Sequence, residues 1–434
     1  MLSLISLEVT GFFFVLLLIR RGRYGCSVTE FLALSFFLGT GFVAYQSFLC
    51  YLLGRAFTFS NLMIVPTVLF ILVFARYASN PGRLDGLFRG EKEFRRWDLI
   101  ERLLLAGLAV QFLWTLFLVL PIPVNSHDAV ANYALKAKIF HLAGGIPRGF
   151  FGWEEATVAH PDYPLFLPLL MTWIYAFTGF NDLTVNLVMP VVYLAFIGLF
   201  YSLIRKFFNR AYSLLVTFIL ATIPQLADYA TVIHADLILS ALVGCALAYF
   251  VLYIRRKERE YLVFSSILLG ISLLVKNEAI VFTGAFFAVL TMFVLRSNPL
   301  RRKKILADIV VSFLIIVVIA APWFAVKISS GTVNSDIDLS KMTAERLVQN
   351  ARHIPVMLYL FQQEVFGPKK WNIFWMIFFA GIIWKARALL KGERFYITVF
   401  LVIAAAGYFC GYMAITGGNL YFYVNTTIPR FMLH

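Results

Sequence analysis

Apolar runs of about 20 residues recur along the chain, and a helix needs about this length to cross the hydrocarbon core of a bilayer. Hydrophobic residues make up 61% of the 434 residues and charged residues only 14%, so few charges interrupt the runs. A backbone in lipid must satisfy its own hydrogen bonds, which favours helices. We therefore expect an all-α, polytopic membrane bundle with about a dozen transmembrane helices and amphipathic helices at the outer face.

The runs predict individual helices, separated by loops that alternate in charge. The predicted helices cover residues 2–19, 27–53, 57–76, 98–120, 185–204, 211–226, 237–254, 260–275, 279–295, 305–326, 371–384 and 395–415. Basic clusters lie in the loops 20–25, 76–98, 205–210, 255–260, 296–304 and 385–394. Cytoplasmic loops carry an excess of Lys and Arg, so the non-basic loops, above all 121–163 and 327–370, are expected outside. The net charge of +15 therefore indicates orientation and no nucleic-acid partner.

Two apolar segments need separate interpretation. The first run has no basic segment before it and no small-residue cleavage site after it, which favours a retained helix over a signal peptide. Residues 164–180 are also apolar, but a full crossing there would place the basic loop 205–210 outside. We therefore expect a re-entrant or partly inserted helix in this segment.

The segment "VNSHDAVANYALKAKIF", residues 124–140, places a group of polar residues at the end of an apolar run. A helix over 126–141 would put Asp128, Asn132 and Lys136 on one face, at i, i+4 and i+8. Such a helix would lie along the membrane surface. Two simpler interpretations stay open, because Asp128 could cap the helix and Lys136 could extend to lipid headgroups.

Three further motifs place ionisable residues at predicted outer ends of helices, where such residues are costly and often functional. In "HPDYP", two prolines bias His160 and Tyr163 away from helical dihedrals, which predicts a rigid turn presenting His160 and Asp162. A plain proline-rich start of a helix is the alternative. "HADLIL" contributes Asp236, and "VKNEA" contributes Lys276, Asn277 and Glu278. Lys276 is predicted either to pair with Glu278 or to contact an anionic phosphate.

In this order, "HDAVANYALKAKIF", "HPDYPLFLPLL", the aspartate of "HADLIL" and "VKNEA" resemble the successive motifs of bacterial integral-membrane glycosyltransferases of the GT-C superfamily. The most similar branch comprises protein O-mannosyltransferases, lipid A aminoarabinose transferases and rhizobial lipopolysaccharide galacturonosyltransferases. The resemblance extends from about residue 98 to 300, with a looser fit of "NTTIPR". It departs at His127, where members of this branch carry an aromatic or small residue.

The resemblance implies an inverting, single-displacement sugar transfer from a polyprenyl-phosphate donor, such as an undecaprenyl-phosphate sugar. The site would face the periplasm from the bacterial cytoplasmic (inner) membrane, and the acceptor would be a glycan, a glycolipid such as lipopolysaccharide, or a protein of the cell envelope. Asp128 matches the aspartate that acts as base on the acceptor. Lys136 and Lys276 are expected to bind the donor phosphate. The residues expected to bind or orient substrate are Asn132, Tyr133, His160, Asp162, Asp236, Asn277 and Glu278.

No cofactor is predicted beyond the polyprenyl-phosphate sugar as co-substrate. A histidine and two carboxylates could instead bind a divalent metal, but the spacing gives this alternative no support. The four cysteines have no C-x-x-C spacing, so neither a disulfide framework nor a thiolate metal site is predicted.

Two other functional classes remain as alternatives. A lipid-linked sugar transporter or flippase should show inverted repeats and charges near mid-membrane, whereas these ionisable groups gather on one face. A polysaccharide polymerase or ligase would share the lipid-linked donor, but such enzymes usually centre on arginine- and histidine-rich outer loops. The polymerase or ligase is therefore the second choice.

The resemblance divides the chain into three parts. Residues 1–97 hold the N-terminal transmembrane helices and a cytoplasmic loop. Residues 98–300 form the GT-C-like catalytic core with the outer loop 121–163. Residues 301–434 hold the C-terminal helices with the outer loop 327–370, whose polar residues are expected to cover the site or to remain solvated. A further helix is expected beyond His434, so the sequence is interpreted as a short or incomplete form.

Overall fold

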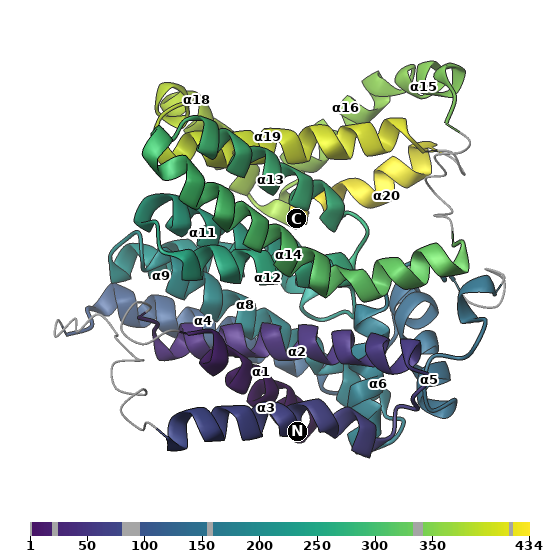
Figure 1. The fold of residues 1–434 in the computed structure, drawn as a ribbon. Helices are drawn as coiled ribbons and strands as arrows, with labels where there is room; N and C mark the ends of the chain where they lie inside the picture. Colours follow the sequence, from purple (N-terminus) through teal and green to yellow (C-terminus); the bar gives the residue numbers. More distant parts are fainter. Residues whose placement is uncertain (1, 20–24, 80–95, 154–158, 333–341, 416–419) are drawn as a thin grey trace.

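The computed structural model describes residues 2–19, 25–79, 96–153, 159–332, 342–415 and 420–434 (Figure 1). Across these ranges the chain forms helices, turns and loops but no strand, which confirms the predicted polytopic helical class. Most long helices run side by side across the molecule (Figure 1). The basic segments 20–24 and 80–95 lie outside the described residues.

Each helix predicted from an apolar run has a counterpart whose ends differ by a few residues. The observed helices are α1 (Leu2–Leu18), α2 (Val28–Leu52), α3 (Phe59–Ala78), α4 (Leu99–Val119), α8 (Val188–Ile204), α9 (Arg210–Ala221), α11 (Ala235–Arg256), α12 (Arg259–Val275), α13 (Ala279–Leu295), α14 (Pro299–Ser330), α18 (Phe374–Leu389) and α19 (Gly392–Met413). Within the described residues, 7 helical segments are long and apolar enough to cross a membrane. Several other predicted helices are present but shorter.

Burial separates central helices from peripheral ones. Inside the most apolar window, 83% of α11 and 72% of α2 is buried, against 17% of α3 and 11% of α4. The exposed apolar faces of α3 and α4 suit contact with lipid, because lipid tails are as apolar as the side chains. The helices α2 and α11 therefore form the middle of the bundle.

The helices α1 and α2 approach each other closely because each has a glycine at the crossing. A Cβ atom on Gly11 would lie 1.7 Å from the carbonyl oxygen of Ser35, and one on Gly39 would lie 2.0 Å from that of Leu7. Small residues allow backbone contact of this kind between membrane helices. No side chain larger than hydrogen fits at either position without moving a helix.

The expected inserted segment forms α6 (Phe166–Thr178), a helix of 13 residues. At a rise of about 1.5 Å per residue it is too short to cross a bilayer. It is held inside protein, since residues 166–175 are buried and Trp173 donates a hydrogen bond to Ser6 Oγ of α1 at 3.1 Å. It packs beside α5 (Leu135–Leu142).

Three predicted segments differ from the structure. The expected α-helix over 126–141 begins instead as a π-helix, η2 (Ala129–Ala134), and only then becomes α5. The expected loop 327–370 is largely helical in its described part, with α15 (Ala344–Ala351), α16 (Ile354–Phe366) and α17 (Pro368–Trp371). The C-terminal stretch, where no helix is predicted after residue 415, contains α20 (Leu420–Leu433). Two polar residues of the predicted outer loop 327–370, Asp336 and Asp338, lie outside the described residues.

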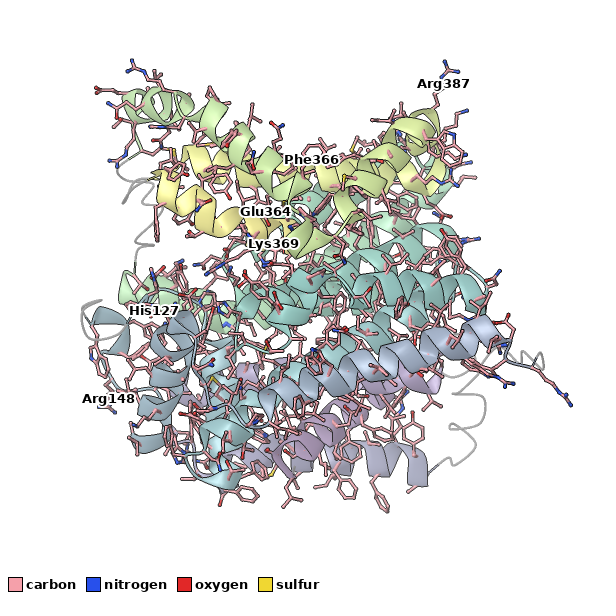
Figure 2. The ribbon with its side chains drawn as sticks, turned by 180° about the vertical axis from the view of Figure 1, so that it is seen from behind. His127, Arg148, Glu364, Phe366, Lys369 and Arg387 are labelled. Atoms are coloured by element: carbon pink, nitrogen blue, oxygen red, sulfur yellow. The ribbon has the colours of Figure 1, made fainter. Side chains whose placement is uncertain are left out.

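The remaining short helices connect the long ones. They are η3 (Phe150–Gly152), α7 (Asp182–Asn186) and α10 (Pro224–Tyr229). Figure 2 shows His127 and Arg148 at one end of the molecule and Arg387, in the last turn of α18 and within the predicted basic loop 385–394, at the other. At these positions, the predicted outer loop 121–163 and the predicted basic loop 385–394 therefore lie at opposite ends of the bundle.

Candidate active site

Asp128 and Arg430 form an ion pair at the end of the bundle that carries His127. Arg430 Nη2 donates a hydrogen bond to Asp128 Oδ2 at 2.6 Å, and both side chains are partly buried. Asp128 stands at the start of η2, but its carboxylate does not cap that helix. Ser126 does so, because its Oγ accepts a hydrogen bond from the Ala129 amide at 3.2 Å. Capping therefore does not explain Asp128.

The charge of Arg430 determines the ionisation of Asp128. Burial raises the pKa of the carboxyl, but Arg430, with smaller contributions from His234 and His127, holds the pKa below its usual value. Asp128 is consequently a carboxylate at neutral pH. The neighbouring His127 ring has 93% of its side chain exposed, with Nδ1 3.7 Å from Asp128 Oδ1.

A second ion cluster joins α11 to the turn between α12 and α13. Lys276 Nζ lies 2.9 Å from Asp236 Oδ1 and 3.0 Å from Glu278 Oε1. The predicted pairing of Lys276 with Glu278 is therefore observed, and Asp236 is an additional partner. Burial would lower the pKa of Lys276, but the two carboxylates raise it above its usual value. The lysine is an ammonium, shared between two anions.

Aromatic residues connect the two ion clusters. Tyr133 of η2 is buried, and its ring centroid lies 6.5 Å from that of His234, whose Nδ1 is 3.7 Å from Asp236 Oδ2. Tyr229 also packs against His234, with a centroid separation of 5.3 Å. Arg430 interacts electrostatically with both Asp128 and Asp236. The two clusters therefore belong to one site.

Lys136 and Asp162 occupy a neighbouring buried cluster beside the "HPDYP" turn. Lys136 is only 1% exposed, and its Nζ donates to the His160 carbonyl at 2.6 Å. Burial lowers the pKa of Lys136 to about 7 and raises that of Asp162. Within the described ranges, Asp162 Oδ2 has no hydrogen-bond partner. Asp128 and Lys136 thus contact different partners, because the π-helical turns of η2 alter the spacing that an α-helix would give.

The turn itself departs from the expected extended backbone. His160 has a φ of 49°, in the left-handed region that few non-glycine residues adopt, and its ring stacks on Tyr163 at 4.4 Å. Such strain is often found at functional sites. In this conformation the His160 carbonyl accepts the hydrogen bond from Lys136.

Two cavities adjoin the Lys276 cluster. The first, here called the tyrosine cavity, has a volume of about 190 Å³ and is lined by Lys276, Asn277, Glu278 and Tyr163, Tyr408, Tyr412 and Tyr423, among others. The second, the apolar cavity, has a volume of about 500 Å³ and lies between α11, α13, α16, α18, α19 and α20. Tyr408, Tyr412 and Phe431 line both cavities, so the two are adjacent.

The structure thus brings together Asp128, Tyr133, Asp236, Lys276, Asn277 and Glu278, with Lys136, His160 and Asp162 in the adjoining cluster. Asn132 lies on η2 with a buried Oδ1 that has no hydrogen-bond partner among the described residues. Sequence reasoning missed two contributors, Arg430 and His434, and gave no role to His234, although this histidine begins the motif "HADLIL". The loosely matching "NTTIPR" ends in Arg430 and was the available signal. His434 Nε2 lies 3.2 Å from Asp236 Oδ1.

No group of three or more His, Cys, Asp or Glu side chains able to hold a metal converges in the described part of the chain. Lys276 and Arg430 provide the positive charge nearest to Asp236 and Asp128.

Fold and site together define a multi-pass helical membrane protein with a buried ionic site at one end of its bundle. Residues 162–323 match the family described as dolichyl-phosphate-mannose-protein mannosyltransferase. The matched segment includes Asp162, Asp236, Lys276 and Glu278 and therefore supports a membrane glycosyltransferase that uses a lipid-linked sugar donor. No curated protein and no solved structure matches the chain.

Proposed function

We propose that the protein transfers a sugar from a polyprenyl-phosphate donor to an acceptor hydroxyl at the site around Asp128. The observation that carries this proposal is the adjacency of the tyrosine cavity and the apolar cavity. A polyprenyl-phosphate sugar has an apolar tail and a polar head joined at a phosphate, and it requires such a pair of spaces. The family match of residues 162–323 independently supports a lipid-linked donor.

The apolar cavity suits the first isoprene units of the donor. Its wall is formed mainly by aromatic and aliphatic side chains such as Phe282, Phe361, Phe378 and Phe400. Burial of hydrocarbon against such a wall requires no specific polar contact, so the cavity would accept tails of different length. The polar groups on the wall of this cavity include Tyr408 and His434, and the phenol oxygen of Tyr408 lies 2.7 Å from Nδ1 of His434.

The reaction needs a base and a stabilised leaving group. In the proposed step the acceptor oxygen attacks the anomeric carbon as the bond from that carbon to the phosphate oxygen breaks. Asp128 takes the acceptor proton, and the bond electrons leave with the polyprenyl phosphate. A single displacement of this kind inverts the anomeric centre. Asp128 suits the role because it is ionised at neutral pH and partly exposed.

Cationic side chains would stabilise the phosphate. Lys276 carries a charge at the edge of the tyrosine cavity, and Arg430 carries another beside Asp128. Lys136 supplies a third in its protonated form, from the adjoining cluster. Fixed charges in a site that excludes water stabilise a developing anion strongly, because little solvent screens them.

The other polar residues of the site would orient the substrates. Tyr133 and Asp236 interact electrostatically with charged groups of both ion clusters. They would keep Asp128, Lys276 and Arg430 in fixed relative positions. Substrate hydroxyls are assigned to the groups with unused hydrogen-bonding capacity or a place on the cavity wall, namely Asn132, His160, Asp162, Asn277 and Glu278. Alignment of two substrates in this way contributes to rate by itself.

The proposed location is a bacterial cytoplasmic membrane, with the site facing outward. His127 lies at one end of the molecule and Arg387, from the predicted cytoplasmic segment 385–394, lies at the other (Figure 2), and an excess of Lys and Arg marks the cytoplasmic side. A glycan, a glycolipid or a protein could reach Asp128 from the end that carries His127. The clustering of ionisable residues at one end argues against the transporter alternative, and the family match favours a transferase over a polymerase.

The decisive experiment is a donor-turnover assay with the purified protein in detergent. Polyprenyl phosphates carrying different radiolabelled hexoses are incubated with a cell-envelope extract as the acceptor source. We expect label to move from the lipid fraction to a larger product with at least one donor, with release of polyprenyl phosphate. No transfer from any donor in the set, with a protein that remains folded, would contradict the proposal.

A further inference from the structure

The tyrosine cavity adjoins an ion cluster with an excess of negative charge, formed by Lys276, Asp236 and Glu278. The ionic groups on its wall are Lys276 and Glu278. Lys276 is shared between Glu278 at 3.0 Å and Asp236 at 2.9 Å, so one ammonium faces two carboxylates. The nearby Arg430 is engaged by Asp128 at 2.6 Å. Each cation is therefore already matched by carboxylate charge before any substrate enters.

Glu278 is the carboxylate that a ligand can reach. Its side chain is 27% exposed, whereas that of Asp236 is 1% exposed. The ion pair with Lys276 uses Oε1, so Oε2 can accept a hydrogen bond from a ligand hydroxyl. Ionised carboxylates only accept hydrogen bonds, which suits a sugar hydroxyl and opposes a second carboxylate.

The rest of the wall suits a sugar ring. Tyr163, Tyr408, Tyr412 and Tyr423 line the cavity and combine an apolar ring face with a polar hydroxyl. An aromatic face packs against the C–H groups of a pyranose, while hydroxyls and carboxylates bind its edges. The volume of about 190 Å³ is that of a small polar ligand and leaves no room for a chain of sugars.

We propose that Glu278 selects the donor sugar by charge, so that the tyrosine cavity accepts a neutral hexose and rejects the corresponding hexuronic acid. This inference rests on the proposed function and assigns the transferred sugar to the tyrosine cavity. A uronic carboxylate would lie beside Glu278, while Lys276, the cation on the cavity wall, is already shared by Asp236, Glu278 and, in the proposed function, the donor phosphate. Repulsion between like charges is strong in a site that excludes water.

The test compares two synthetic donors that differ only at C6, a polyprenyl phosphate carrying a hexose and one carrying its C6 carboxylate. The ratio of kcat/KM for the two donors is measured for the wild type and for Glu278→Gln. We expect the wild type to prefer the neutral donor about 100-fold and Glu278→Gln to reduce that ratio about tenfold. Gln keeps the size and one acceptor oxygen but removes the charge.

Two control variants isolate the charge of Glu278. Glu278→Asp keeps the charge and should keep the preference, even if its overall rate falls. Glu393→Gln removes a carboxylate that pairs with Arg255 and does not line the cavity, so its donor ratio should equal that of the wild type. Thermal unfolding identifies any variant that fails to fold, and Glu278→Ala then replaces Glu278→Gln in the same comparison.

The outcomes separate this inference from the proposed function. Turnover of the neutral donor with a ratio that Glu278→Gln leaves unchanged would overturn charge selection while the transferase activity stands. Equal use of both donors by the wild type would overturn it as well. Turnover of neither donor by a folded wild type would contradict the proposed function for this sugar and remove the basis of the inference.

Discussion

Arg430 donates a hydrogen bond to Asp128 at 2.6 Å and so joins two residues that are 302 positions apart in the sequence. The contact brings α20, near the end of the sequence, onto the turn that begins η2. It also explains how a carboxylate can be partly buried and ionised, since the guanidinium outweighs the effect of burial on its pKa. The geometry of the proposed base therefore depends on α20 as much as on its own loop.

Replacement of Asp128 by Asn should abolish most of the transfer activity. Asparagine has nearly the shape of aspartate but cannot accept the acceptor proton, and loss of a general base typically costs 10²–10⁴-fold in rate. The rate is measured as transfer of labelled sugar from the lipid donor, alongside thermal unfolding. Ser126→Ala is the matched control, because it removes the cap at Ala129 and should cost about 1 kcal/mol of stability with little loss of rate. A folded Asp128→Asn variant with wild-type turnover would exclude Asp128 as the base.

Replacement of Arg430 by Met should shift the pH dependence of the reaction. Arg430 holds the pKa of Asp128 below its usual value, so its removal lets burial raise that pKa. The base must be deprotonated, and activity should therefore be lost at a higher pH as the medium is acidified. The measurement is the acidic limb of the kcat/KM profile, with Arg430→Lys as the control that keeps a positive charge. An unshifted limb in Arg430→Met would show that Asp128 does not control it.

Replacement of Lys276 by Met should weaken both donor binding and stability. A hydrogen bond to a charged group contributes about 1.5–3 kcal/mol, which sets the expected loss of donor affinity. Loss of the ammonium also leaves the buried Asp236 without its cation, and breaking a buried pair typically costs about 3–5 kcal/mol. The double variant Lys276→Met with Asp236→Asn should recover part of the stability but none of the donor affinity. Recovery of both in the double variant would reduce Lys276 to a structural ion pair.

Replacement of Gly11 by Ala should destabilise the contact between α1 and α2. The added Cβ would lie 1.7 Å from a backbone oxygen of Ser35, so the helices must separate, and overpacking typically costs about 1–3 kcal/mol. Gly284→Ala is the control, because no atom lies within 4 Å of its added Cβ and alanine favours a helix. Thermal unfolding in detergent should show a lower midpoint for Gly11→Ala and an equal or higher midpoint for Gly284→Ala. Equal midpoints in the two variants would mean that α1 and α2 separate without cost.

The helices of the bundle could be predicted because each long apolar run is a local signal. The expected ranges for α2 and α13 differ from the observed bounds by at most one residue at either end. The helix α20 was missed because its sequence mixes polar residues and Pro429 into a short apolar stretch, and it is stabilised by packing on α16. The segment 129–134 was predicted as an α-helix, because no local pattern distinguishes a π-helix from it.

The site was predictable only in part, for a related reason. Motifs identified Asp128, Asp236, Lys276 and Glu278 as outer polar residues, but which of them meet depends on helix packing. The ion pair between Lys276 and Glu278 could be predicted, because the two residues are only two positions apart in the sequence. The pair between Asp128 and Arg430 could not, because the position of α20 is determined by long-range contacts.

Burial lowers the pKa of Lys136 to about 7. An amine with this pKa is charged at lower pH and becomes neutral as the pH rises through about 7, whereas the phosphodiester of the donor stays singly ionised throughout. If Lys136 binds that phosphate, donor affinity should fall as the pH is raised from about 6 to about 8.

Two variants separate this titration from other groups of the site. Lys136→Arg should bind the donor with little dependence on pH, because arginine remains protonated, and Lys136→Met should bind weakly at every pH. Donor Kd is measured by titration calorimetry at three pH values for each protein. A wild-type Kd that does not change with pH, together with unchanged binding by Lys136→Met, would assign Lys136 to the support of the His160 carbonyl alone. Because calorimetry measures donor binding directly, this experiment tests the role of the Lys136 charge without requiring sugar transfer.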